Sequence, residues 1–144
     1  MKKRKNFRKA FSLIELLIVI AILGLLVGMV APSLMDRADQ AKRDQVCIQM
    51  AEIHKALEMF KLDNGVLPDT EEGIEALLAN PDPEKYPGYS VKPYMERLPK
   101  DAWKHPFIYI NQEGRVELIS FGSDRKEGGK GFASDIFFTK ECQK

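Results

Sequence analysis

Three acidic side chains stand out because of where they lie in the sequence. Glu15 is the only charged residue in the apolar stretch 11–35, and Asp124 and Asp135 flank the glycine-rich turn 128–131. Carboxylates and loop carbonyls are the hard oxygen ligands that suit Ca²⁺. The spacing of Asp124 and Asp135 does not match an EF-hand loop, so spacing alone favours a solvated turn over a calcium site.

The other side chains that could carry chemistry form no recognisable catalytic set. His54 and His105 are isolated, and the sequence has no phosphate-binding loop and no Cys/His cluster with zinc spacing. We therefore expect no enzyme activity. A membrane-tethered enzyme, or a binding module that uses the tyrosines of residues 80–99, is a weaker alternative.

The two cysteines, Cys47 and Cys142, lie far apart in the sequence. If this part of the chain is outside the cytoplasm, they could form one disulfide that joins a helix to the C-terminus. The alternative is a pair of unpaired, small apolar residues.

The charge is distributed unevenly along the chain. Six of the 22 basic residues lie in residues 1–10, which leaves 16 basic against 21 acidic residues in the rest. The acidic body argues against nucleic-acid binding, because a nucleic-acid partner requires a basic face. The basic N-terminus is typical of the cytoplasmic side of a membrane span.

The apolar stretch 11–35 is long enough to cross the hydrocarbon core of a bilayer as a helix. The sequence does not resemble a cleaved secretory signal, which has small residues at −3 and −1 from the cut. A cut after Ala31 would place Met29 at −3 and Pro32 at +1. An ordinary uncleaved anchor explains the length but gives no reason for Glu15. A carboxylate at the centre of a membrane costs about 2.5–3.5 kcal/mol on insertion scales and usually marks function.

The helical pattern continues beyond the apolar stretch. Apolar residues recur at spacings of three and four, which places them on one helix face. We predict one continuous helix over about residues 11–62, with a stop at 63–65, of which only the second half packs on a soluble domain. The apolar face of that half consists of Val46, Met50, Ile53, Leu57 and Phe60.

Three further elements follow the predicted long helix. Thr70 is placed to cap a short helix. Residues 80–99 hold five prolines and predict a surface loop whose tyrosines cover apolar area. Residues 107–121 alternate in polarity and turn at Glu113-Gly114, which predicts a β-hairpin.

The N-terminal segment KAFSLIELLIVIAILGLL resembles the class III signal of type IV pilins and pseudopilins. The resemblance implies that prepilin peptidase removes the leader 1–10 between Ala10 and Phe11, and that Phe11 is then methylated. The family usually has glycine before the cut, but alanine is also small, so we expect Ala10 to be processed, though more slowly. Glu15 would meet the N-terminal amine of a neighbouring subunit during assembly, and Gly24 and Pro32 also match the family, with Pro32 loosening the helix.

Later segments resemble the major pseudopilin of type II secretion systems. They are KLDNG at 61–65, TEEGIEALL at 70–78, LPKDAW at 98–103 and SFGSDRKEGGKGFASDI at 120–136. The resemblance implies an α+β, type IV pilin-like fold, with a long N-terminal helix packed on a small antiparallel sheet. It also implies a Ca²⁺ site in the last of these segments. Its ligands would be the backbone carbonyl of Phe121 with Ser123, Asp124, Ser134 and Asp135, while Lys130 stands where related loops often have an acid.

The resemblance also implies an organisation and a function. The leader 1–10 would precede a transmembrane and assembly helix, 11–35, and a periplasmic globular domain, 36–144. The protein would be held in the inner membrane with its N-terminus cytoplasmic. An inner-membrane assembly platform would polymerise it, with minor pseudopilins, into a periplasmic filament that aids export of folded proteins through an outer-membrane secretin. The alternative is a type IV pilin of a surface fibre.

Overall fold

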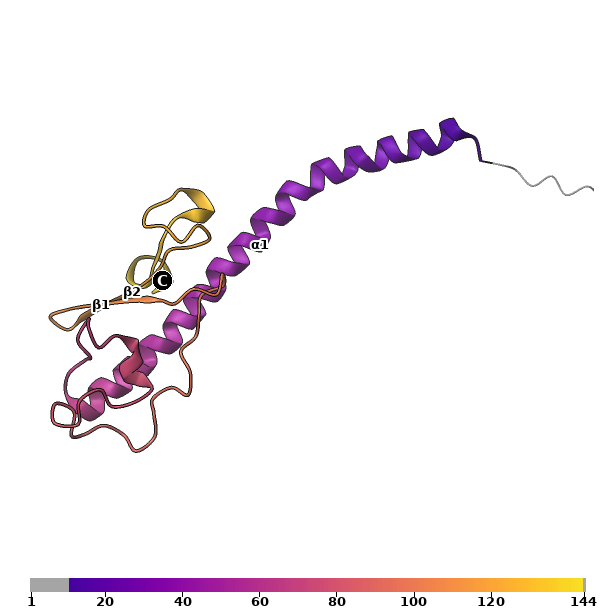
Figure 1. Cartoon of the computed structure of the whole chain (residues 1–144). Coiled ribbons are helices and arrows are strands. Elements are labelled where there is room, and N and C mark those ends of the chain that lie inside the picture. Colours follow the sequence, from indigo (N-terminus) through magenta and orange to yellow (C-terminus); the bar gives the residue numbers. More distant parts are fainter. Residues whose placement is uncertain (1–10, 144) are drawn as a thin grey trace, which may run out of the picture. The chain divides into compact units, whose positions relative to one another are not determined.

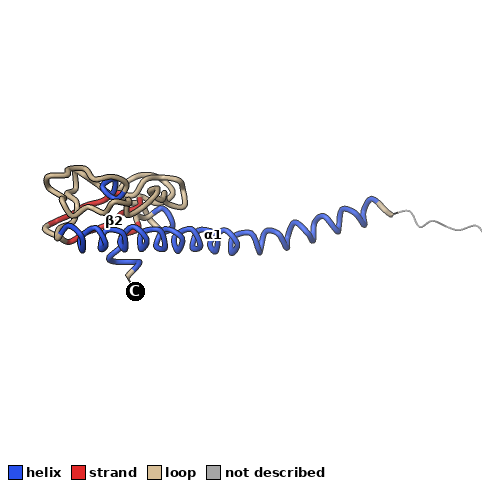
Figure 2. The backbone as a smooth tube through the Cα atoms, turned by 90° about the horizontal axis from the view of Figure 1, so that it is seen from below, coloured by secondary structure: helices blue, strands red, loops and turns tan. Residues whose placement is uncertain are grey.

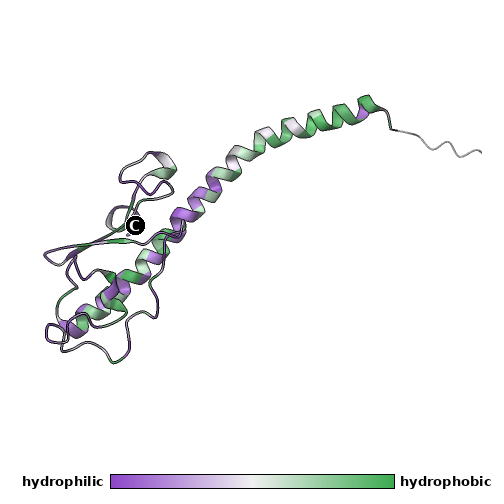
Figure 3. Cartoon of the chain, viewed as in Figure 1, coloured by the Kyte–Doolittle hydropathy of each residue, from purple (hydrophilic) through white to green (hydrophobic). Residues whose placement is uncertain are grey.

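Helix α1, Leu13–Asn64, is the longest element of the computed structural model, which describes residues 11–143 (Figure 1). The predicted long helix is thus confirmed, and its helical backbone continues through Gly28 and Pro32. The chain divides into two compact units between Ala38 and Asp39, so α1 contributes residues to both. Figure 3 shows the change in hydropathy along α1, from a mostly apolar first half to a mixed second half.

The second unit contains a three-stranded antiparallel sheet in the order β1-β2-β3. Its strands are β1, Ile108–Gln112, β2, Arg115–Ser120, and β3, Ile136–Phe137. Glu113 and Gly114 both have positive φ, 54° and 85°, as a two-residue hairpin turn of type I′ requires. The predicted hairpin and the α+β fold class are therefore confirmed.

The core of this unit lies between the second half of α1 and the sheet (Figure 2). All five residues predicted for the apolar face of α1 are buried. They pack with inward-facing side chains of the strands, among them Tyr109, Leu118 and Ile136. Helical periodicity in the sequence thus identifies the face that the sheet covers.

The prediction for Thr70 is wrong. The short helix is a single 3₁₀ turn, η1, Ile74–Leu77, and the residue before it is Gly73, with no side-chain cap. The hydroxyl of Thr70 instead donates to the carbonyl of Asn111 at 3.2 Å and accepts from the Asn111 amide at 2.9 Å. Thr70 therefore joins the segment after α1 to strand β1.

The tyrosines of the proline-rich loop surround Phe60 of α1. The rings of Tyr86, Tyr89 and Tyr94 lie with their centroids 4.9, 5.8 and 5.3 Å from that of Phe60. Their hydroxyl groups donate to acceptors within the same unit, such as the carbonyl of Ala76 at 2.9 Å from Tyr89. This cluster covers the end of the core, as predicted, and the use of its hydroxyls inside the unit disfavours a tyrosine-based binding module.

A small polar network fixes the segment that contains Glu72. Lys85 Nζ donates to Asp69 at 2.6 Å and to Glu72 at 2.8 Å, and the Tyr86 hydroxyl also donates to Glu72. Burial would raise the pKa of Glu72, but the hydrogen bonds from Lys85 and Tyr86 and from the Asp69 amide outweigh it and lower that pKa. The pKa of Lys85 is raised by its hydrogen bonds to Asp69 and Glu72. The ionised Glu72 is therefore a structural group of the soluble unit.

Candidate functional site

The first half of α1 presents apolar side chains in every direction. Every large apolar side chain of residues 11–35 is at least 45% exposed within the chain. By length and composition, this part of α1 could cross a membrane. A surface of this size and polarity requires lipid or other protein chains to cover it.

Glu15 lies in the first turn of this apolar helix. Its side chain is exposed and makes no ion pair with any residue of the described range 11–143. Phe11, two residues before α1, is 82% exposed, and Ala10 lies outside the described residues. The carboxylate and the predicted new N-terminus are thus both accessible to another chain.

Gly24 lies inside α1, and nothing outside the local helix backbone is within 4 Å of where its Cβ would be. Pro32 also lies within α1, which continues beyond it as a helix. The absence of a side chain at Gly24 therefore serves no packing need within the described chain.

The second candidate site is the loop between β2 and β3, residues 121–135, which includes a short 3₁₀ turn, η2, Gly131–Ala133. Ser123 and Asp124 are exposed on its first arm, and Asp124 Oδ1 accepts a hydrogen bond from the Lys126 amide at 3.1 Å. On its second arm, the Ser134 hydroxyl donates to the Gly131 carbonyl at 2.8 Å. The predicted ligands therefore come from two arms of one loop.

Asp135 is the most enclosed of the predicted ligands, with 8% of its surface exposed. Its Oδ2 accepts from the Gly128 amide at 2.9 Å, while its own amide donates to the Gly128 carbonyl at 3.1 Å. Its Oδ1 is buried and has no hydrogen-bond partner among the described residues. A buried carboxylate oxygen without a partner is unfavourable, so this oxygen fits a hard cation such as Ca²⁺.

Carbonyl oxygens of the second arm lie close to two glycines earlier in the loop. A Cβ on Gly122 would lie 3.1 Å from the Ser134 carbonyl oxygen, and one on Gly129 would lie 2.3 Å from that of Ala133. Glycine at both positions leaves room for these oxygens beside the residues that follow Phe121, whose own side chain is half-buried. The Ala133 carbonyl is an oxygen of this loop that sequence reasoning missed, because a backbone group carries no residue-type signal.

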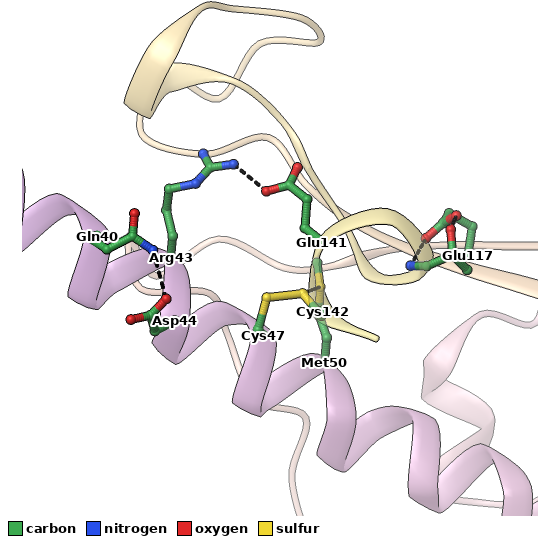
Figure 4. The surroundings of a disulfide bond; sticks show 9 residues. Gln40, Arg43, Asp44, Cys47, Met50, Glu117, Glu141 and Cys142 are labelled. Atoms are coloured by element: carbon green, nitrogen blue, oxygen red, sulfur yellow. Dashed lines mark hydrogen bonds and ion pairs between the residues drawn. A yellow bond between two sulfur atoms is a disulfide. The ribbon is translucent and has the colours of Figure 1, made fainter. Parts of the chain in front are cut away.

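The C-terminal segment lies against α1 beside this loop (Figure 4). It forms a short π-helical turn, η3, Phe138–Cys142, and Cys142 is joined to Cys47 of α1 by a disulfide with a Cα–Cα distance of 5.1 Å. Arg43 donates to the Ser134 carbonyl at 3.0 Å and to Glu141 Oε2 at 2.6 Å. A charged side chain on a helix is usually solvated, but that of Arg43 is only 14% exposed.

Comparison with known proteins assigns the chain to a family. The model of the family "Type II secretion system (T2SS), protein G" matches residues 33–139. The chain belongs to this family. A second model, "Prokaryotic N-terminal methylation motif", matches residues 5–31, the range that holds Ala10, Phe11, Glu15 and Gly24.

Similar proteins support this family membership, and their alignments extend over most of the chain. The type II secretion system core protein G of Pseudomonas aeruginosa is 38% identical and that of Vibrio cholerae 35%. The aligned regions cover 94% of this chain and 96% and 94% of those proteins, respectively. The crystal structure of the major pseudopilin of enterohaemorrhagic Escherichia coli matches with a TM-score of 0.61 at 30% identity, over 74% of this chain and 93% of that one. The chain is thus a member of the major pseudopilin family of type II secretion.

Proposed function

We propose that this protein is the major structural subunit of a type II secretion pseudopilus. Prepilin peptidase cuts between Ala10 and Phe11, and Phe11 is methylated. The subunit waits in the inner membrane with its N-terminus cytoplasmic and its soluble unit periplasmic. An inner-membrane assembly platform then polymerises it, together with minor pseudopilins, into a filament that aids export of folded proteins through an outer-membrane secretin.

The observation that carries this proposal is the exposed apolar half of α1 with its one carboxylate. Lipid covers the apolar surface before assembly, and neighbouring helices cover it afterwards. Moving Glu15 into a helical bundle would bury a charge, which is strongly unfavourable without a partner. The free amine of Phe11 on a neighbouring subunit supplies an opposite charge, so the pair favours one register between helices.

The first test compares Glu15→Gln with Glu52→Gln, which removes an exposed charge from the second half of the same helix. We expect Glu15→Gln to lower filament yield by about tenfold or more, since a charge-assisted contact is worth about 1.5–3 kcal/mol. The amount of the Glu15→Gln subunit in the membrane fraction should not change, and Glu52→Gln should assemble normally. Mass spectrometry of the mature protein should show a chain that begins at methylated Phe11.

Two results would overturn the assembly proposal. One is normal filament formation by Glu15→Gln. The other is a mature chain that begins after Ala31, or one that keeps residues 1–10 in cells with active prepilin peptidase.

We also propose that the loop before β3 binds Ca²⁺ through the Phe121 carbonyl, Ser123, Asp124, Ser134 and Asp135. The unpartnered, buried Oδ1 of Asp135 supports this proposal. A bound cation would add positive charge to a loop that carries the carboxylates of Asp124 and Asp135. Lys130, exposed in the same loop, adds a positive charge of its own and is expected to weaken the site.

Thermal unfolding with Ca²⁺ or with a chelator tests the calcium site. At an ion concentration a hundredfold above Kd, binding should stabilise the folded state by about 2.7 kcal/mol. Asp135→Asn should lose this stabilisation, whereas Glu127→Gln, which neutralises a neighbouring exposed acid, should keep it. An unfolding midpoint that is the same with Ca²⁺ and with chelator would refute the calcium site.

A further inference from the structure

The guanidinium of Arg43 connects two parts of the chain that lie on either side of β3. Nη1 donates to the carbonyl of Ser134, two residues before the strand, and Nη2 donates to Glu141, four residues after it. A planar guanidinium presents its donors in a fixed fork, so the two contacts are geometrically coupled.

The sheet alone holds this region weakly. Strand β3 has only two residues, and its pairing with β2 is limited to Ile119↔Phe137 and Ser120↔Ile136. Isolated pairing of this length is marginal in water. Other contacts must therefore fix where the loop enters β3.

The disulfide fixes the far end of the same region. Cys47 lies four residues after Arg43 on α1, and positions four apart share a helix face. Cys142, its partner, is adjacent to Glu141. The disulfide therefore keeps the Glu141 carboxylate within reach of the Arg43 guanidinium, as Figure 4 shows.

The Ser134 carbonyl, which accepts from Arg43, lies next in the chain to Asp135, whose buried Oδ1 has no hydrogen-bond partner among the described residues. Ser134 directly precedes Asp135, and Asp135 closes the segment 128–135 through two hydrogen bonds with Gly128. Moving the Ser134 carbonyl would move the buried Asp135 carboxylate with it. Arg43 itself has no acceptor atom and cannot be a cation ligand.

We propose that Arg43 is a positioning residue for the segment 128–135, and that the Cys47–Cys142 disulfide holds Glu141 so that the guanidinium keeps its orientation. Glu141 and Cys142 lie beyond residue 139, where the family match ends. This positioning role stands on the contacts alone. Only its effect on Ca²⁺ affinity rests on the calcium site proposed above.

Hydrogen exchange of the full chain in detergent micelles, without added Ca²⁺, tests the role directly. The amides of Gly128 and Asp135 should exchange about tenfold faster or more in Arg43→Met, because charge-assisted hydrogen bonds are lost. The Leu57 amide, in the middle of the core helix, should be unchanged in this variant. Lys42→Met, which removes an adjacent, partly exposed charge that pairs with Asp39 at 3.8 Å, should behave as the wild type.

Two further variants separate the parts of the proposal. Arg43→Lys keeps the charge but not the fork, so its exchange rates should fall between those of Arg43→Met and the wild type. In Cys47→Ala/Cys142→Ala, exchange at Gly128 and Asp135 should accelerate more than exchange at Leu57. Calcium titration should show about a tenfold higher Kd in Arg43→Met and in the double variant.

Wild-type exchange rates in Arg43→Met would overturn the positioning role. Equal acceleration at Leu57 and Gly128 in the double variant would overturn the part assigned to the disulfide. If the wild-type protein binds no Ca²⁺, the calcium proposal fails, while the exchange rates still decide whether Arg43 positions the loop.

Discussion

The two halves of α1 have similar backbones and opposite surfaces. In residues 13–35 the large aliphatic side chains and the methionines are exposed, whereas Val46, Met50, Ile53, Leu57 and Phe60 form one stripe that is buried. The first half depends on partners outside the chain, and the second half carries its partner within the same chain. One helix can thus belong to a folded domain and to a membrane or filament, because the distribution of apolar residues changes along it.

Two glutamates show the same contrast in charge. Glu72 is ionised among donors from its own unit, Lys85, Tyr86 and the Asp69 amide. Glu15 has no ion-pair partner among residues 11–143, although it begins the more apolar half of α1. Glu72 should therefore contribute to the stability of the single subunit, and Glu15 to contacts between subunits.

The largest expected effect is a difference in the free energy of unfolding between substitutions in the two halves of α1. Phe60→Ala removes a fully buried ring that contacts three tyrosines, and should lower the free energy of unfolding of the soluble unit by about 3–5 kcal/mol. Leu23→Ala, in the exposed half, should leave that free energy unchanged. Denaturant unfolding followed by Trp103 fluorescence measures both, and equal losses would contradict the division of α1.

A smaller effect separates the two glutamates by their pH dependence. Because the pKa of Glu72 is lowered on folding from its usual 4.5, its contribution is complete above that value and is lost as pH falls through the folded-state pKa. Glu72→Gln should therefore lower stability by about 1–2 kcal/mol at neutral pH, with the difference vanishing in acid. Unfolding curves at several pH values measure this difference.

Two matched variants serve as controls for Glu72. Glu71→Gln removes an adjacent exposed carboxylate, and Glu15→Gln removes the carboxylate of the apolar half. Neither should change the stability of the soluble unit. A pH-independent difference between Glu72→Gln and the wild type would contradict the role of its charge.

The smallest effect concerns Gly24. With no atom beyond the local helix backbone near its Cβ position, Gly24→Ala should raise the helix content of the isolated subunit in micelles, since alanine is favoured over glycine by about 0.5–1 kcal/mol. The unfolding midpoint of the soluble unit should not change, while filament yield should fall if neighbouring helices approach at this point. Circular dichroism and filament yield measure the two effects, and a lower unfolding midpoint would contradict the separation.

Regular patterns in the sequence predict regular structure in this molecule. The spacing of Val46 to Phe60 predicts the buried helix face, and alternation around Glu113-Gly114 predicts the hairpin, because each pattern repeats with the period of its element. The role of Thr70 is not predictable in this way. Its hydroxyl serves as well for a strand contact as for a helix cap, and only the tertiary structure decides between them.

The loop before β3 is predicted as a cation site by resemblance alone, because the spacing of Asp124 and Asp135 by itself favours a solvated turn. The Ala133 carbonyl leaves no residue-type signal, and a strand as short as β3 leaves little. Arg43 is concealed in another way. Its charge predicts solvent exposure, but Arg43 lies three residues before Val46 and seven before Met50, and so continues the buried face of the helix. The chain that folds back from residue 134 onward supplies its partners.

The three ties between α1 and the end of the chain also determine when the soluble unit can be completed. Arg43 to Ser134, Arg43 to Glu141 and Cys47 to Cys142 span 91, 98 and 95 residues. None can form until residues 134–142 have been synthesised, so the early part of the unit must wait for them. A high contact order of this kind slows folding. Without Glu141 and Cys142, two of the three ties would be missing, and we expect proteases to cleave the more open unit more readily.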